Sequence, residues 1–319
     1  MLTRKELINT INNLAATRQS FVFIVDFKGE KGLVFLESEA HDDNLQYCIE
    51  QTHSLAAPQF DWQVEPIPYP VYEQKFNYVR QQIQQGNSFL VNLTQPTPIR
   101  TNLTPERIYT HAKARYKVWL KNEFIALSPE TFVRINNGRI SSYPMKGTID
   151  ANIPNAKELI LNNAKEKAEH ATIVDLIRND LSMVAEQVEV TRYRYIDRLK
   201  TNQGELLQVS SEISGVLPTD YHQNLGDILF KLLPAGSISG APKPKTVQII
   251  ETAEGYERGF YTGIFGKFDG TNLDSAVLIR FIELSDDKMT FKSGGGITSQ
   301  SICMDEYNEL IHKVYVPIY

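Results

Sequence analysis

Residues 130–148, ETFVRINNGRISSYPMKGT, decide which fold the chain adopts. Apolar and polar side chains alternate on both sides of Asn137-Gly138, which is the period of a half-buried β-strand. An Asn-Gly pair between two such runs is a strong hairpin signal, because both residues tolerate positive φ. We therefore predict two antiparallel strands, the second of which leads directly into the segment MKGT, residues 145–148.

Other segments of the chain repeat this pattern and alternate irregularly with helices. Apolar runs predict further hairpins within residues 21–38 and 260–284, and residues 235–245 read as a loop. Helical periodicity and capping signals predict helices at residues 71–86, 105–116, 246–255 and 305–314. They also predict a long helix from about residue 155 to beyond residue 184, with a possible break near Asn179-Asp180. The fold class is therefore α+β with antiparallel sheets flanked by helices, and not the regular βα alternation of a Rossmann fold.

Composition excludes several classes of function. The hydrophobic content of 42% and the charged content of 22% are those of a soluble globular protein. A net charge of −5 provides no basic field for nucleic acid or for an anionic membrane surface. The two cysteines, Cys48 and Cys303, form no CxxC pattern, and the first residues lack the apolar core of a signal peptide. We expect a cytoplasmic protein without disulfides, and no composition shift divides residues 1–319 into separate domains.

Lys146 and Glu130 flank the predicted hairpin. Because a hairpin brings its ends together, the two side chains could be neighbours. A glutamate in a desolvated pocket can serve as a general acid, and a lysine there can serve as a nucleophile. The alternative is a surface salt bridge across the hairpin, which contributes little to stability. Spacing alone does not separate these interpretations.

Two pairs of glutamates recur at the same helical spacing. Glu166 and Glu169 lie three residues apart on one predicted helix, and Glu306 and Glu309 lie three apart on the last, so each pair shares a helix face. Each pair alone is more often a solvated face. Together they are oxygen ligands suited to Mg²⁺, whereas the absence of histidine at these positions disfavours zinc.

Groups suited to anions lie near the C-terminus. The backbone N–H groups of Gly294, Gly295 and Gly296 can face an anion without side-chain interference. Arg280 ends an apolar run, where it could clamp a carboxylate or pair with a structural acid. Glycine loops are common at ordinary turns, so these signals are weak individually.

Eight ordered segments, from about Val71 to Lys313, resemble the chorismate-utilising enzymes. They are LVNLTQ (90–95), LSPE (127–130), YPMKGT (143–148), KEKAEHATIVDLIRNDLSMV (165–184), LLPAGSISGAPKPK (232–245), GYERGFYTGIFG (255–266), LDSAVLIR (273–280) and SGGGITSQS with DEYNELIHKV (293–314). The resemblance implies one chorismate-binding domain over residues 1–319, with a shortened N-terminal portion (1–70), a catalytic core (71–319) and the active site between the layers.

The resemblance also implies roles for individual residues. Mg²⁺ would be held by Glu166, Glu169, Glu306 and Glu309 and would bridge to one carboxylate of chorismate. The other carboxylate would meet Arg280, Tyr261, Lys313 and the backbone of residues 294–296. Thr148 matches the threonine that follows the active-site glycine of the family.

Lys146 indicates which reaction to expect. In the family, the turn resembling MKGT carries alanine in anthranilate synthases and lysine in 4-amino-4-deoxychorismate synthases. Isochorismate and salicylate synthases activate water with a lysine where this chain has Leu90. We therefore expect a synthase that aminates chorismate at C4 for 4-aminobenzoate and folate synthesis, with a covalent Lys146 intermediate and Glu130 as acid. Anthranilate synthase component I and a non-catalytic chorismate-binding protein remain the alternatives.

The ammonia source is expected to be a separate protein. A glutamine amidotransferase needs a cysteine in a glycine-rich elbow, and neither Cys48 nor Cys303 lies in one. Two features depart from the family: Leu207 stands where many relatives carry histidine, and the region before Val71 is short. The segment LVFLES (33–38) resembles one that binds tryptophan in relatives, but too little surrounds it to predict a regulatory site.

Overall fold

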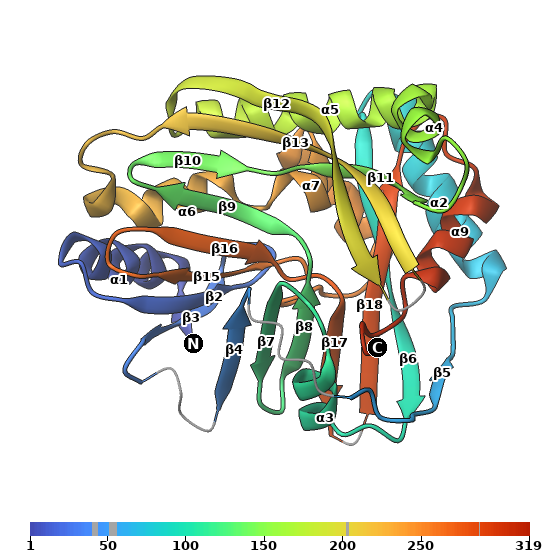
Figure 1. The fold of residues 1–319 in the computed structure, drawn as a ribbon, viewed down its shortest axis with the longest axis horizontal. Coiled ribbons are helices and arrows are strands. Elements are labelled where there is room, and N and C mark those ends of the chain that lie inside the picture. Colours follow the sequence, from blue (N-terminus) through green and yellow to red (C-terminus); the bar gives the residue numbers. More distant parts are fainter. Residues whose placement is uncertain (40–43, 51–55, 202–203, 287) are drawn as a thin grey trace.

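Two antiparallel sheets form the framework of the molecule (Figure 1). The structure, a computed structural model, describes residues 1–319 except 40–43, 51–55, 202–203 and 287. Among these described residues the larger sheet has the strand order β1 (Leu2–Thr3), β3 (Lys31–Leu36), β2 (Phe21–Val25), β15 (Ile264–Phe268), β16 (Leu273–Val277), β9 (Thr131–Asn136), β10 (Arg139–Ser142), β13 (Gly204–Val216) and β11 (Met145–Asp150), with β12 (Glu186–Thr201) paired to β13. The other sheet has the order β14 (Gly240–Ala241), β6 (Leu90–Thr101), β18 (Lys288–Ile297), β17 (Phe281–Ser285), β8 (Phe124–Ser128), β7 (Tyr116–Leu120) and β4 (Leu45–Ile49), with β5 (Trp62–Val64) paired to β6.

Helices cover these sheets, as Figure 1 shows. They are α1 (Arg4–Ala16), α2 (Tyr69–Gln84), α3 (Pro105–His111), α4 (Ala156–Asn162), α5 (Ala164–Ser182), α6 (Leu225–Leu232), α7 (Gly236–Ser239), α8 (Lys243–Glu254) and α9 (Cys303–His312). The long helix α5 packs along β12 and β13, while α2 and α9 pack against β6 and β18. None of the helices in the described ranges combines the length and the apolar content that a membrane crossing requires.

The hairpin of residues 130–148 forms as predicted. β9 and β10 are antiparallel with Ile135 opposite Ile140, and Asn137 (φ 49°) and Gly138 (φ 78°) make the turn. Two positive φ values in succession match the right-handed twist of the flanking strands, which explains the preference for Asn-Gly. The α+β class with antiparallel sheets is confirmed.

The helix predicted over residues 155–184 breaks at a different place. α4 and α5 meet at Asn163, which is extended (ψ 113°), and α5 continues through Asn179-Asp180. The Asn163 side chain accepts a hydrogen bond from the Glu166 backbone N–H at 3.1 Å. This N-cap satisfies a donor at the start of α5 and makes a new helix start favourable.

Two other boundaries differ from the sequence prediction. The segment 235–245 is not a plain loop, because it contains α7, β14 and the first turn of α8, where Pro244 occupies an early position that needs no N–H partner. The apolar run 273–284 is divided between β16 of the larger sheet and β17 of the other. The chain changes sheet at residues 278–280, where Arg280 has a φ of 50°.

The apolar core lies between sheets and helices. All five residues of β2, FVFIV, are buried, because β2 lies inside the larger sheet between β3 and β15. α1 buries Leu7, Ile11 and Ala15 against this region, one face at helical spacing. Burying a Phe or Leu side chain contributes about 1.5–3 kcal/mol each, so this core fixes the framework on which the site is built.

Candidate active site

A cavity of about 950 Å³ lies where the two sheets approach each other. Its walls come from β11 of the larger sheet, from β6 and β18 of the other, and from helices α5, α7 and α9 with the turns beside them. The site residues predicted from sequence that line it are Glu130, Lys146, Thr148, Glu166, Glu169, Tyr261, Arg280, Gly294, Gly295, Gly296, Glu309 and Lys313. Glu306 lies behind this wall, 7% exposed.

Lys146 reaches into the cavity from β11 and does not pair with Glu130. Its Nζ lies 2.8 Å from Oε2 of Glu169, and its side chain is 30% exposed. Burial by itself lowers the pKa of the Lys146 ammonium, but the charges of Glu169, Glu309 and Glu166 outweigh it, so the pKa is raised. The lysine is thus held as a cation beside an acidic wall, and the salt bridge with Glu130 that the sequence left open as an alternative does not form.

Glu130 occupies another part of the cavity wall. It follows β8, and its Oε1 accepts a short hydrogen bond from the Ser237 hydroxyl on α7. Burial raises the pKa of the Glu130 carboxyl, although the Ser237 hydrogen bond and the cations Lys313 and Arg280 oppose the shift. A carboxyl group with a raised pKa is suited to donate a proton.

Three of the four glutamates, Glu166, Glu169 and Glu309, line the cavity, and Glu306 is buried behind its wall. The Oε2 atom of Glu166 is buried without a hydrogen-bond partner, while Glu309 pairs with Lys313 at 2.6 Å. A Cβ on Gly147 would lie 3.1 Å from Glu166 Oε2, and a Cβ on Gly295 would lie 3.3 Å from Glu306 Oε2. Glu166 therefore lies against Gly147, and Glu306 and Glu309 lie against Gly295, where a larger residue would crowd the carboxylates.

Carboxylates in this arrangement suit a hard cation by their chemistry, although they do not form a preassembled metal cluster. No three His, Cys, Asp or Glu side chains of the described residues come together as a metal site. Two of the four carboxylates are instead engaged in ion pairs, Glu169 with Lys146 and Glu309 with Lys313.

Hydrogen-bond donors and cations lie along the wall near Glu130. Arg280 projects from the crossing between the sheets, with its guanidinium 5.1 Å from the centre of the Tyr315 ring. Lys313 follows α9 and donates to the Gly294 carbonyl at 2.9 Å. Burial raises the pKa of the Tyr261 phenol, which therefore remains a proton donor. These groups can bind a carboxylate.

A sequence model of the chorismate binding enzymes matches residues 19–318. The chain belongs to this family. It is 49% identical over 320 residues to a Haemophilus influenzae protein named "Uncharacterized PabA-like protein", covering 99% of this chain and 98% of that one. It is 35% identical over 251 residues to anthranilate synthase component 1 of Acetivibrio thermocellus, covering 73% of this chain and 49% of that protein.

Solved structures agree with the family. Anthranilate synthase component I from Streptococcus pneumoniae superposes with a TM-score of 0.69 at 27% identity, covering 82% of this chain and 60% of that one. The menaquinone-specific isochorismate synthase from Escherichia coli superposes with a TM-score of 0.75 at 16% identity, covering 98% and 81%, which shows the common fold alone. The resemblance to chorismate-utilising enzymes and the fold it implied are confirmed.

Three further residues, Leu90, Leu207 and His170, can now be placed. Leu90 lines the cavity and is 7% exposed, so an aliphatic side chain occupies that part of the wall. Leu207 is buried on β13 opposite Ile149, whereas its neighbour Gln208 lines the cavity. His170 is buried and hydrogen-bonded to the Ser211 hydroxyl at 2.7 Å, and burial lowers its pKa to about 4. It is a packed neutral histidine.

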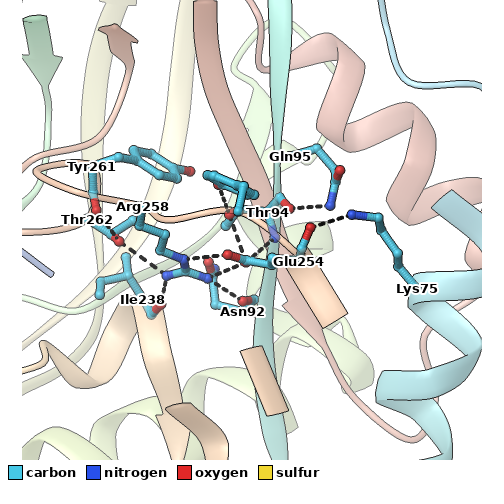
Figure 2. Close-up of polar contacts among 10 residues, drawn as sticks. Lys75, Asn92, Thr94, Gln95, Ile238, Glu254, Arg258, Tyr261 and Thr262 are labelled. Carbon is cyan, nitrogen blue, oxygen red and sulfur yellow. Dashed lines mark hydrogen bonds and ion pairs between the residues drawn. The ribbon is translucent and has the colours of Figure 1, made fainter. Parts of the chain in front are cut away.

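Sequence reasoning missed several residues of the wall. Ser237 holds Glu130, and the only signal for it was a glycine- and serine-containing segment. Arg258 and Glu254 form a buried ion pair behind the cavity at 2.6 Å (Figure 2). Their spacing of four residues is compatible with such a pair, but spacing alone does not distinguish it from a surface pair.

Proposed function

We propose that this chain is an aminodeoxychorismate synthase component I, which converts chorismate and ammonia into 4-amino-4-deoxychorismate for 4-aminobenzoate and folate synthesis. The observation that carries the proposal is that Lys146 and Glu130 line the same cavity. Leu90, which cannot act as a base, also lines this cavity, at the position where water-activating relatives carry a lysine. An amine nucleophile and a carboxylic acid suit a double displacement, whereas nothing at Leu90 would activate water.

Lys146 is the proposed nucleophile. Lys146 first gives one proton to the Glu169 carboxylate, which lies 2.8 Å from its Nζ and returns the proton when the amine is released. The neutral amine attacks C2 of chorismate, the ring double bonds shift, and the C4–O bond breaks. Ammonia then attacks C4, the double bonds shift back, and the C2–N bond breaks, so that Lys146 leaves with its electron pair. The two displacements leave the new nitrogen at C4, where the hydroxyl stood.

Glu130 is the proposed acid. Its raised pKa supports this role because burial favours the protonated carboxyl, and the Ser237 hydrogen bond fixes the position of that carboxyl. Glu130 gives its proton to the departing C4 hydroxyl, which leaves as water. After ammonia has attacked C4, the resulting ammonium returns a proton to the Glu130 carboxylate. The sum is chorismate and ammonia to aminodeoxychorismate and water.

Arg280, Tyr261 and Lys313 are proposed to bind one substrate carboxylate, together with the N–H groups of residues 294–296. Their common position on the cavity wall supports this proposal. Thr148, on β11 two residues after the nucleophile, is proposed to contact the substrate as well. Fixing the dianion at both of its carboxylates would bring C2 into line with the Lys146 amine.

Mg²⁺ is the proposed cofactor, with Glu166, Glu169, Glu306 and Glu309 as the residues that would hold it. The buried Glu166 oxygen without a hydrogen-bond partner and the space at Gly147 and Gly295 support this assignment. When bound, Mg²⁺ would neutralise the charge between these carboxylates and a carboxylate of the substrate.

A separate glutamine amidotransferase is the proposed source of ammonia. Cys48 lies on β4 and Cys303 begins α9, and neither is among the described residues that line the cavity. Ammonium salts should replace the partner in vitro.

A product assay tests the proposal. The purified protein is incubated with chorismate, Mg²⁺ and ammonium, and a separate aminodeoxychorismate lyase is then added. We expect 4-aminobenzoate, formed only after the lyase is present. Anthranilate forming without the lyase would show an anthranilate synthase, and an unchanged chorismate concentration would show a binding protein; either result rejects the proposal.

A further inference from the structure

The guanidinium of Arg258 is the centre of a buried polar network beside the cavity (Figure 2). Arg258 is 3% exposed and Glu254 is 2% exposed. All five guanidinium N–H donors are used: two bind the Glu254 carboxylate, and the others bind the Asn92 carbonyl, the Ile238 carbonyl and the Thr262 hydroxyl. Only arginine has a planar set of donors that can reach so many acceptors at once.

These three acceptors belong to three different segments of the cavity wall. Asn92 lies on β6 and pairs with Gly296 of β18, and Ile238 lies on α7. Thr262 lies in the turn before β15 and has a φ of 60°, which is unfavourable for a β-branched residue. All three residues line the cavity, whereas Arg258 is not among its described lining residues.

Each segment either carries or directly contacts a group that is proposed to act on chorismate. Tyr261 precedes Thr262, and Ser237, which holds Glu130, precedes Ile238. Gly296 lies across the strand pair from Asn92. A displacement of any of these segments would therefore move a substrate contact.

Glu254 holds the guanidinium in place and is itself held from β6. The Thr94 backbone N–H and hydroxyl both donate to Glu254 Oε1 at 2.8 Å, and the Lys75 ammonium donates to the Glu254 carbonyl. Charge-assisted hydrogen bonds that are removed from water are the strongest of their kind, so this arrangement restricts the orientation of Arg258.

We propose that Arg258, oriented by Glu254, is a positioning residue for chorismate binding: it fixes the three wall segments relative to one another without contacting the substrate. The inference rests on the proposed substrate contacts of Tyr261, Glu130 and Gly296. It depends on chorismate binding and not on which product is formed.

The test measures the dissociation constant of chorismate by calorimetry with Mg²⁺, with every substitution placed in a Lys146→Ala background so that no covalent step occurs. Arg258→Lys keeps the charge but cannot reach all the acceptors, and we expect the Kd to rise about tenfold. Thr94 is not among the described residues that line the cavity. Thr94→Val removes the hydroxyl that donates to Glu254, and we expect the Kd for chorismate to rise about threefold.

Two controls separate positioning from loss of stability. Thr94→Ser keeps the hydroxyl and should bind chorismate within about twofold of the parent. Asp274→Asn disturbs another polar network, in which Asp274 accepts from Tyr116 and Arg134, and should lower the melting temperature without changing the Kd. The inference is overturned if folded Arg258→Lys and Thr94→Val both bind chorismate with a Kd within about twofold of the parent. It is also overturned if Asp274→Asn raises the Kd as much as these two variants do. If Arg258→Lys does not fold, Thr94→Val decides.

Because the calorimetry contains no ammonium, the background protein forms no product during the measurement, and a failed product assay on the wild type leaves this test intact. Absence of 4-aminobenzoate would reject the proposed function, whereas unchanged chorismate binding in the variants would reject the positioning role.

Discussion

Lys146 is surrounded by carboxylates, and its chemistry depends on them. Glu169 lies 2.8 Å from its Nζ, and the charges of Glu309 and Glu166 add to the effect. Desolvation would favour a neutral amine, but here the acidic wall outweighs it and the pKa is raised. The side chain is thus held at a fixed place in the cavity, which is what a nucleophile aimed at one ring carbon requires.

Replacing Lys146 should change the product as well as the rate. In Lys146→Ala we expect no detectable 4-aminobenzoate after addition of lyase, because no covalent intermediate forms. Anthranilate should appear instead, since ammonia can then add directly at C2. Chromatography of the products, with and without lyase, measures both. Undiminished 4-aminobenzoate from a folded variant would exclude Lys146 as the nucleophile.

Glu130 should determine the alkaline limb of the pH profile. A general acid works only while protonated, and burial raises the pKa of this carboxyl. Its contribution is therefore complete below that raised pKa and is lost as the pH increases through it. Glu130→Gln should lower kcat by roughly 10²–10⁴-fold and remove this limb from the plot of kcat against pH. A limb that persists in the variant would assign the titration to another group.

At the scale of elements, the break between α4 and α5 was predicted at the wrong place. The apolar periodicity continues across Asn163, so periodicity alone gave one helix, whereas the capping hydrogen bond to the Glu166 N–H starts a new one. The β9–β10 hairpin was predictable because its Asn-Gly turn is specified by two adjacent residues. The change of sheet between β16 and β17 was not, since it depends on which distant strands are available for pairing.

Asn163 should therefore support both stability and metal binding. Removing the cap in Asn163→Ala should cost about 1 kcal/mol of unfolding free energy, and it should raise the Mg²⁺ concentration needed for half-maximal activity because Glu166 lies in the first turn of α5. Thermal melts and Mg²⁺ titrations measure the two effects. Asn163→Asp retains the capping oxygen, so an equal loss in that variant would argue against the cap as the cause.

At the scale of the whole molecule, the site is assembled from segments that are distant in the chain. Glu130, Lys146, Arg280 and Lys313 were each identified as candidates from residue type and family resemblance, and all four line one cavity. Their mutual arrangement was not predictable, because it depends on how the two sheets pack. The pairing of Lys146 with Glu169 instead of Glu130 is the clearest example.

The stability of the framework that holds these segments should depend on its apolar core, whereas chorismate binding by the folded protein should not. Phe23 of β2 is fully buried, and its ring packs against Gly266 of β15. Phe23→Ala should lower the unfolding free energy by about 3–5 kcal/mol, through lost burial and the cavity left behind. Urea denaturation measures the loss, and the KM for chorismate of the folded fraction should stay unchanged. A loss below about 1 kcal/mol would indicate that this part of the core repacks freely.

The covalent intermediate is the most direct test of the proposed reaction. The protein is mixed with chorismate and Mg²⁺ without ammonium, quenched in acid, and examined by intact-mass spectrometry and peptide mapping. We predict an added mass equal to chorismate less one water, located on Lys146, absent from Lys146→Ala and discharged when ammonium is supplied before the quench. An unmodified Lys146 in protein that nevertheless produces 4-amino-4-deoxychorismate under turnover conditions would contradict it.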